Sequence, residues 1–325
     1  MTRRRLQGTA LDVHPLCLGG SVFGWTADTS TSHRVLDVYA DAGGNFLDTA
    51  DSYSQWVPGN SGGESERIIG TWLASRGNRD RMVIATKVGR SERHPGLDAA
   101  TVRRAAEESL RRLRTDHIDL YYAHIDDPSV PFEETLGALD ALRREGLVRH
   151  VAVSNITGPR LTEALTAAER ADLPRYSALQ TPYNLVRRAE FERELLPVCL
   201  AADLPTIPYL ALEQGFLTGK YRPGRKVAGP RAEAASAPGR TAAGRAVLFA
   251  LDELAAARGT TPAAVALGWL AGRPTVAAAL ASARTPEQLK ELLAGADLVL
   301  EAAETALLDA ASRTPEPFPV GAFRP

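Results

Sequence analysis

The sequence of 325 residues is poor in cysteine and methionine, with two of each. Cys17 and Cys199 both lie in apolar segments, so they form neither a disulfide framework nor a metal motif and are expected to be small buried side chains. No segment approaches the ~20 apolar residues of a membrane-spanning helix. The basic start, residues 2–5, is not followed by the apolar region of a secretory signal. We therefore expect a cytoplasmic protein without a membrane partner.

An excess of either charge is also missing. The 38 basic and 39 acidic side chains give a formal net charge of −1, which argues against nucleic acid as a partner. Hydrophobic residues at 44% and charged residues at 24% are ordinary for a globular protein. A chain of this length can form one α/β barrel, and we expect a single domain over residues 1–325 with no bound metal.

Short apolar segments alternate with segments of helical periodicity along the whole chain. After a predicted β-hairpin at residues 5–13 with Gly8 in its turn, strand-length segments lie near residues 16, 46, 84, 120, 151, 179, 208 and 278. Eight such units predict an α/β fold of the (β/α)₈ TIM barrel type, here with the N-terminal hairpin and extra C-terminal helices. The alternative, a doubly wound sheet, is disfavoured because residues 19–24 depart from the G-x-G-x-x-G fingerprint and lead into no helix.

Two loops stand out between these elements. Residues 219–245 are rich in Gly, Pro, Ala and Arg and are predicted to form a long structureless loop. The loop is either a solvated basic segment or a mobile flap over an anionic ligand. Its cationic residues are Lys220, Arg222, Arg225, Lys226 and Arg231. The other loop, residues 57–63, is predicted to be flexible and could gate a pocket.

Polar side chains follow many of the predicted strands at the point where each strand ends. They are Asp48, Lys87, His124, Ser154, Asn155, Gln180 and Tyr209. In a barrel these strand ends share one rim, where active sites are built. We therefore expect these groups to lie together at one site.

Several motifs in this order resemble those of the aldo-keto reductases. They are residues 46–53, 85–87, 119–124, 153–155, 180–184, 215–221 and 283–289, and the resemblance covers about residues 4–312. It implies reduction of a small-molecule aldehyde or ketone by a nicotinamide cofactor. Tyr53 would donate the proton and His124 would orient the carbonyl oxygen.

A free phenol has a pKa near 10, so Tyr53 needs help to act as an acid–base group near neutrality. Lys87 would lower the pKa of Tyr53, and Asp48 would hold Lys87 in place.

The resemblance also places a cofactor. Ser154, Asn155 and Gln180 would bind the nicotinamide carboxamide, which offers both a donor and an acceptor, and Tyr209 would stack on the ring. The remaining expected cofactor residues are Gly20, Ser21 and Asp48 near the nicotinamide ribose, then Leu210, Leu212, Gly215, Leu217, Gly219 and Lys220 around the pyrophosphate, and Ser282, Arg284, Gln288 and Glu291 at the adenosine end.

NADP(H) is expected rather than NAD(H), because the Arg284 guanidinium suits a 2′-phosphate. The chain departs from the family pattern nearby. Leu210-Ala211-Leu212 stands where many members have Ser-Pro-Leu, Ser282 replaces a common glycine, and Leu292 replaces an asparagine.

Trp25 and Trp56 lie on rim loops and, with His124, are expected to contact the substrate. Aromatic walls suit flat or apolar compounds. Two other functions stay open. One is a nicotinamide-binding regulatory subunit, and the other is a pathway-specific ketoreductase acting on a sugar or natural-product intermediate. The oligomeric state is not predicted.

Overall fold

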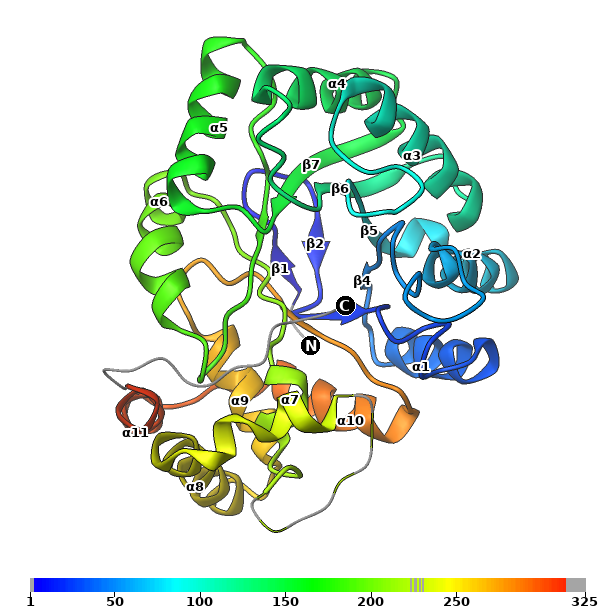
Figure 1. The fold of residues 1–325 in the computed structure, drawn as a ribbon. Helices are drawn as coiled ribbons and strands as arrows, with labels where there is room; N and C mark the ends of the chain where they lie inside the picture. The colour runs from blue at the N-terminus through cyan, green and yellow to red at the C-terminus, as the bar shows by residue number, and fades with distance from the viewer. Residues whose placement is uncertain (1–2, 223, 225–226, 228, 230, 314–325) are drawn as a thin grey trace.

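A computed structural model describes residues 3–222, 224, 227, 229 and 231–313 (Figure 1). The chain opens with the predicted hairpin: β1 (Arg4–Arg5) pairs antiparallel with β2 (Asp12–Val13). Gly8 in its turn has φ +75°, a left-handed conformation that glycine adopts without steric cost. The hairpin lies across the centre of the ring of strands in Figure 1 and buries Leu6 and Leu11 there.

Seven parallel strands form one curled sheet, as the alternating pattern predicts. Its spatial order is β8-β7-β6-β5-β4-β3-β9. The strands are β3 (Leu16–Gly19), β4 (Phe46–Asp48), β5 (Val83–Val88), β6 (Ile118–Ala123), β7 (Val148–Ser154), β8 (Leu179–Gln180) and β9 (Ala279–Ala281). Sequential neighbours pair from β3 to β8, which is the arrangement of a (β/α)₈ barrel.

Residues 205–209 join the two edges of this sheet. Ile207 N donates to Leu179 O of β8 (2.9 Å), and Leu280 N of β9 donates to Pro208 O (2.9 Å). We predicted a regular strand from Thr206 to Leu210, and this is wrong in detail, because the structure has only isolated bridges there. The two prolines at 205 and 208 lack the amide hydrogen that a strand ladder needs.

Helices surround the sheet (Figure 1). They are α1 (Thr29–Asp41), α2 (Glu64–Arg76), α3 (Ala99–Leu113), α4 (Phe132–Arg144), α5 (Gly158–Arg170), α6 (Leu196–Ala201), α7 (Ala232–Ser236), α8 (Ala242–Ala257), α9 (Pro262–Ala271), α10 (Pro286–Ala296) and α11 (Ala302–Ser312). A π-helical turn, η2 (Phe191–Leu195), precedes α6, and short 3-10 turns are η1 (Arg79–Arg81), η3 (Glu213–Thr218) and η4 (Pro238–Arg240). Within the described part of the chain, no helix combines the length and apolar character that crossing a membrane requires.

The apolar residues form two cores, because the side chains of a strand alternate between its two faces. The inner core fills the barrel with residues such as Phe46, Leu120 and Ile207, together with the hairpin. The outer core lies between the strands and the helices and includes Trp72 and Leu136. The inner core closes the hairpin end of the barrel, so the opposite rim is left for a site.

The segment 219–245 is more ordered than predicted. Its described residues include α7 and η4, and α8 begins at Ala242. The run of alanines from residue 232 explains the first helix, since alanine has the highest helix propensity. Arg225 and Lys226 of the predicted basic loop lie outside the described residues.

Helices α2 and α3 approach each other most closely at Gly70. A Cβ atom there would lie 2.2 Å from Arg112 O and 2.7 Å from Leu113 C, both backbone atoms that cannot move alone. Gly70→Ala should therefore lower the free energy of unfolding by about 1–3 kcal/mol, although alanine is the better helix former. A Cβ atom added at Gly137 in α4 would meet no other atom within 4 Å, so Gly137→Ala is the matched control and should raise stability by about 0.5–1 kcal/mol. Denaturant unfolding measures both. An equal gain in the two variants would contradict the close helix contact.

Candidate functional site

The Lys87 ammonium is the centre of the predicted site. Lys87 is fully buried, and its Nζ donates to Asp48 Oδ1 (2.5 Å), Thr49 O (2.7 Å) and Tyr53 Oη (3.0 Å). An ammonium has three donors, so these three acceptors satisfy it. β4 pairs with β5 so that Asp48 lies opposite Ala85, and the two-residue period turns Ala85 and Lys87 to the inner face. The sheet register therefore brings the carboxylate and the ammonium together.

The pKa of Tyr53 is not lowered as the sequence predicts. Burial raises it to about 12, and the opposing effect of the Lys87 charge is too small to reverse this. For Lys87, burial alone would lower the pKa. Asp48 and Tyr53 outweigh this effect of burial, so the pKa of Lys87 lies above its usual range. At neutral pH the site therefore holds a neutral phenol hydrogen-bonded to a cation.

His124 directly follows β6 and faces the same phenol. The ring centroids of His124 and Tyr53 are 6.2 Å apart. Burial, with Lys87 and Arg90 nearby, holds the pKa of His124 well below its usual range. The imidazole is thus neutral at pH 7, and its buried Nδ1 has no hydrogen-bond partner in the described chain.

A network of side-chain amides supports these groups. Gln180 Nε2 donates to Asp48 Oδ2 (2.9 Å), so each Asp48 oxygen accepts from a different residue. Asn155 Nδ2 donates to His124 O (2.8 Å), and Asn155 Oδ1 accepts from Tyr209 Oη (2.7 Å). The amides at the strand ends therefore fix the positions of the neighbouring side chains.

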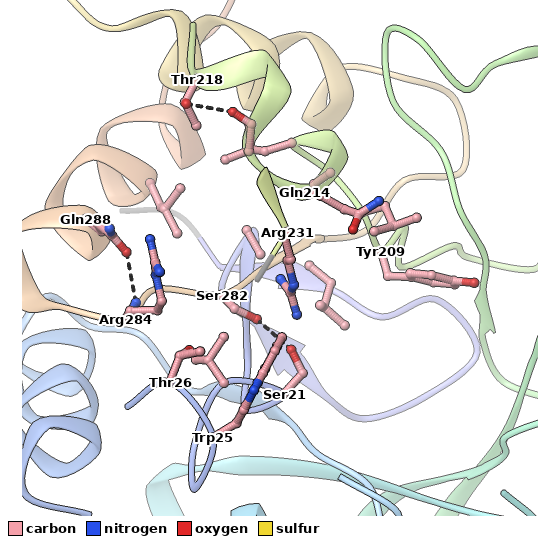
Figure 2. Close-up of a pocket in the computed structure, with 18 of the residues that line it drawn as sticks. Ser21, Trp25, Thr26, Tyr209, Gln214, Thr218, Arg231, Ser282, Arg284 and Gln288 are labelled. Atoms are coloured by element: carbon pink, nitrogen blue, oxygen red, sulfur yellow. Dashed lines mark hydrogen bonds between the residues drawn. The ribbon is translucent and has the colours of Figure 1, made fainter. Parts of the chain in front are cut away.

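A cavity of about 440 Å³ opens from this cluster. Tyr53 and His124 line it, and so do Arg284 and Gln288. In Figure 2, Tyr209 and Arg284 lie on opposite sides of the cavity, with Arg231 between them. The cavity is thus elongated and has chemically different ends.

Most of the predicted cofactor residues line this cavity. They are Ser21, Ser154, Asn155, Gln180, Tyr209, Leu210, Leu212, Gly215, Lys220, Ser282, Arg284, Gln288 and Glu291. Gly20, Asp48, Leu217 and Gly219 are not among the lining residues. Gly20 packs closely instead, because a Cβ there would lie 2.5 Å from Ser65 Oγ, and Leu217 is fully buried in the core.

Part of the cavity lining is cationic and has an unusual backbone beside it. Lys220, Arg231 and Arg284 line the cavity, and their guanidinium and ammonium groups make no ion pair with described residues. Burial first, and then the charge of Arg284, lowers the pKa of both Lys220 and Arg231. Such a cluster favours an anion.

The adjacent backbone is left-handed at Leu210 (φ 56°), Gln214 (φ 56°) and Gly215 (φ 105°). A turn that combines right- and left-handed residues can arrange backbone N–H groups into a concave surface that suits anions. Glu213, itself at φ 42°, is held by Arg187 (2.9 Å) and by Asn184 (2.8 Å). These bonds offset the cost of the strained backbone.

Two tryptophans stand at the mouth of the site. Trp25 lines the cavity, and its ring packs edge-to-face on Trp56 at 5.6 Å between centroids. Trp56 lies 6.4 Å from the Tyr53 ring but is not a lining residue, so it supports the wall rather than forming it. Asn60 of the predicted gate loop donates to Gly24 O (3.2 Å) and Ser54 O (3.1 Å), which ties this loop to its neighbours.

The sequence did not point to Arg90 as a site residue. It pointed to Arg231 only as a cation of a long loop, without placing it in the site. Both line the cavity, and the Arg231 guanidinium lies over the Trp25 ring at 5.0 Å (Figure 2). Arg90 follows β5 by two residues, so the same strand-end rule that selected Lys87 could have found it. Arg231 lies in the segment whose structure the composition did not predict.

A further buried polar residue, Asp51, lies two positions before Tyr53 in the chain. Both carboxyl oxygens of Asp51 are buried without a hydrogen-bond partner in the described chain. Its N–H donates to Lys87 O (3.3 Å), which ties the Tyr53 loop to β5. Burial, and then the charge of Glu66, raises the pKa of Asp51 well above its usual range. Asp51 is therefore expected to be protonated in the folded protein.

A raised folded-state pKa makes Asp51 unfavourable for stability as the pH rises. The unfolded carboxyl ionises near pH 4, while the folded one keeps its proton, so unfolding releases a proton above that pH. Asp51→Asn mimics the protonated form and removes this penalty. We expect the variant to exceed the wild type in free energy of unfolding. The margin should grow as the pH rises above about 4, at up to ~1.4 kcal/mol per pH unit, and level off above the folded-state pKa. Denaturant unfolding at several pH values measures the margin, and a margin independent of pH would contradict a buried neutral carboxyl.

Comparison with known proteins connects this geometry to known chemistry. A family model described as the aldo/keto reductase family matches residues 15–313. The chain is 32% identical over 317 residues to the protein named Protein tas from Escherichia coli (strain K12), covering 89% of this chain and 91% of that protein.

Two further relatives carry names that indicate redox chemistry. The chain is 34% identical over 302 residues to a Bacillus subtilis protein named uncharacterized oxidoreductase YrpG, covering 90% of each chain. It is 30% identical over 329 residues to norsolorinic acid reductase of Aspergillus flavus, covering 95% of this chain and 79% of that protein.

Proposed function

Because the chain belongs to the aldo/keto reductase family, an oxidoreductase family, we propose that it reduces aldehydes or ketones to alcohols with NADPH. The observation that carries this proposal is the hydrogen bond from the buried Lys87 ammonium to Tyr53 Oη (3.0 Å), with the phenol lining the cavity. This contact supports the proposal, because the phenol would give up its proton beside a fixed positive charge.

Each polar group has a role in this reaction. Tyr53, with a pKa of about 12, is protonated at neutral pH and gives its proton to the carbonyl oxygen. Lys87 stabilises the phenolate that remains, since a nearby positive charge favours it. The neutral His124 donates a hydrogen bond that orients the oxygen beside Tyr53. Asp48 balances the Lys87 charge, which would otherwise be costly to bury.

The residues of the cavity fit a nicotinamide dinucleotide. When bound, the cofactor supplies the hydride. Tyr209 offers an aromatic face for a planar ring, and Ser154, Asn155 and Gln180 offer polar atoms beside it. The left-handed backbone from Leu210 to Gly215 would hold the pyrophosphate, together with Lys220 and Arg231. Arg284 would bind the 2′-phosphate. Its backbone is held by Gln288, because Arg284 N donates to Gln288 Oε1 (3.0 Å).

The tryptophans support a flat or apolar substrate. Trp25 lines the open cavity, and Trp56 supports it by an edge-to-face contact. Aromatic rings packed in this way bind apolar surface and exclude water from the carbonyl.

Tyr53→Phe tests the proposed proton donor. Loss of a general acid typically costs ~10²–10⁴-fold in rate, so we expect kcat for NADPH-dependent aldehyde reduction to fall by about this factor. The affinity for NADPH, measured by quenching of nicotinamide fluorescence, should stay unchanged. Tyr121→Phe is the matched control, because Tyr121 is a buried tyrosine of β6 whose hydroxyl has no partner in the described chain.

The outcomes of this test separate the two main functions. Full activity in the Tyr53 variant would disprove the mechanism. A wild-type protein that binds NADPH but turns over no carbonyl compound would favour a nicotinamide-binding regulatory subunit instead.

Arg284→Gln tests the cofactor preference. If Arg284 binds the 2′-phosphate, the ratio of kcat/KM for NADPH to that for NADH should fall by about tenfold, the effect of losing one charge-assisted hydrogen bond. Lys290→Gln removes the same charge from an exposed position of α10 and serves as the control. An unchanged ratio in Arg284→Gln would place the 2′-phosphate elsewhere or leave NADH as the cofactor.

A pathway-specific ketoreductase is the second candidate. The relatives named norsolorinic acid reductase favour it, because such a name indicates one particular substrate. Turnover of a panel of simple aldehydes, aromatic ketones and keto-sugars separates the two. High activity on one aromatic ketone and little on simple aldehydes would select the specific enzyme.

A further inference from the structure

Arg90 lies at the reacting end of the cavity, although neither the proposed chemistry nor the proposed cofactor site uses it. It is the second residue after β5, and it lines the same cavity as Tyr53 and His124. Its charge contributes, after burial and Lys87, to the lowered pKa of His124. A cation is thus fixed near the two groups that would hold the carbonyl.

The backbone that carries Arg90 is held firmly. Gln55 Nε2 donates to Arg90 O (3.3 Å), and Gln55 Oε1 accepts from Glu92 N (3.2 Å). Gly89, at φ +113°, begins the turn, which Gly96 N closes on Gly89 O (3.1 Å). Because Gln55 follows Tyr53 by two residues, the same loop carries the phenol and holds the backbone of Arg90. This degree of order is typical of a prepared binding site.

The Arg90 guanidinium makes no hydrogen bond or ion pair within the described part of the chain. Three partly buried arginines outside the cavity each have a carboxylate: Arg79 pairs with Asp119 (2.8 Å), Arg112 with Glu66 (2.6 Å) and Arg160 with Asp126 (2.8 Å). Removing a cation from water without a counter-charge costs free energy. A ligand that carries an anion would offset that cost.

The cofactor already has other cations for its phosphates. The charge of Arg284 acts on both Lys220 and Arg231, and all three residues line the cavity. Figure 2 shows Arg284 on the opposite side of the cavity from Tyr209, and Arg90 is close enough to Tyr209 to act on its pKa. The anion that Arg90 meets therefore belongs to the other molecule in the site, the substrate.

We propose that Arg90 forms a subsite for a carboxylate of the substrate, so that the preferred carbonyl compounds are aldehydes or ketones bearing an acidic group. This inference rests on the proposed reductase function. A single guanidinium binds a carboxylate through two parallel hydrogen bonds and matches its one charge. A phosphate dianion would need further donors of the kind that the cofactor end provides.

The test compares each acid with its uncharged ester. The substrates are the 2-, 3- and 4-carboxybenzaldehydes and their methyl esters, reduced with saturating NADPH by wild type, Arg90→Gln and Arg90→Lys. For at least one isomer, the wild-type kcat/KM should favour the acid. The acid-to-ester ratio should fall at least about tenfold in Arg90→Gln and less in Arg90→Lys, which keeps the charge but lacks the planar fork. Any change in the pKa of His124 affects acid and ester alike and cancels in the ratio.

Arg93→Gln is the matched control, because Arg93 lies in the same loop but does not line the cavity. An equal fall of the acid-to-ester ratio in Arg93→Gln would show that any positive charge in this loop favours the acid through long-range attraction. That result would overturn the proposal. Equal ratios in wild type and Arg90→Gln, a preference for a formylphenyl phosphate over every acid, or a loss of NADPH affinity without a change of ratio would also overturn it. If the esters are reduced but no acid is preferred, the carboxylate subsite fails while the reductase function stands. If no aldehyde is reduced, the reductase function itself fails.

Discussion

The structure of the site depends on a buried lysine ammonium. Lys87 has no contact with solvent, so each of its donors must find an acceptor within the protein. A carboxylate, a backbone carbonyl and a phenol supply them, and they come from the end of β4 and the loop that follows it. These hydrogen bonds to Lys87 fix the position of Tyr53. Gln180 holds Asp48 in the same way, and Asn155 links His124 to Tyr209.

The barrel determines where this charge can be placed. Parallel strands end at one rim, so six separate parts of the sequence deliver side chains to a common surface. The hairpin and the inner core fill the opposite end, which leaves one elongated cavity with a reacting end and a cationic end. The division matters for the proposed chemistry, because it separates the groups that would act on the carbonyl from those that would hold phosphates.

Sequence patterns predicted much of this. Alternating apolar segments indicated the barrel, and the position of Asp48, Lys87 and His124 after apolar runs indicated a shared rim. Both rely on local regularities, the strand period and the strand end, that a reader can recognise in the sequence. The predicted strand at Thr206–Leu210 and the structureless loop at 219–245 were less accurate. There, prolines interrupt the hydrogen-bond ladder and an alanine-rich run forms a helix within a segment of low complexity.

The sequence by itself thus determined the fold and the set of polar residues at the rim, since both follow from periodicity and residue type. Only the tertiary structure decided how those residues behave. Burial raises the pKa of Tyr53 where the neighbouring lysine alone would lower it, and it also raises the pKa of Asp51. Arg90 gains its significance only from the cavity around it and from the lack of a partner in the described chain. These properties depend on desolvation and on distances between residues far apart in the sequence, which no local pattern contains.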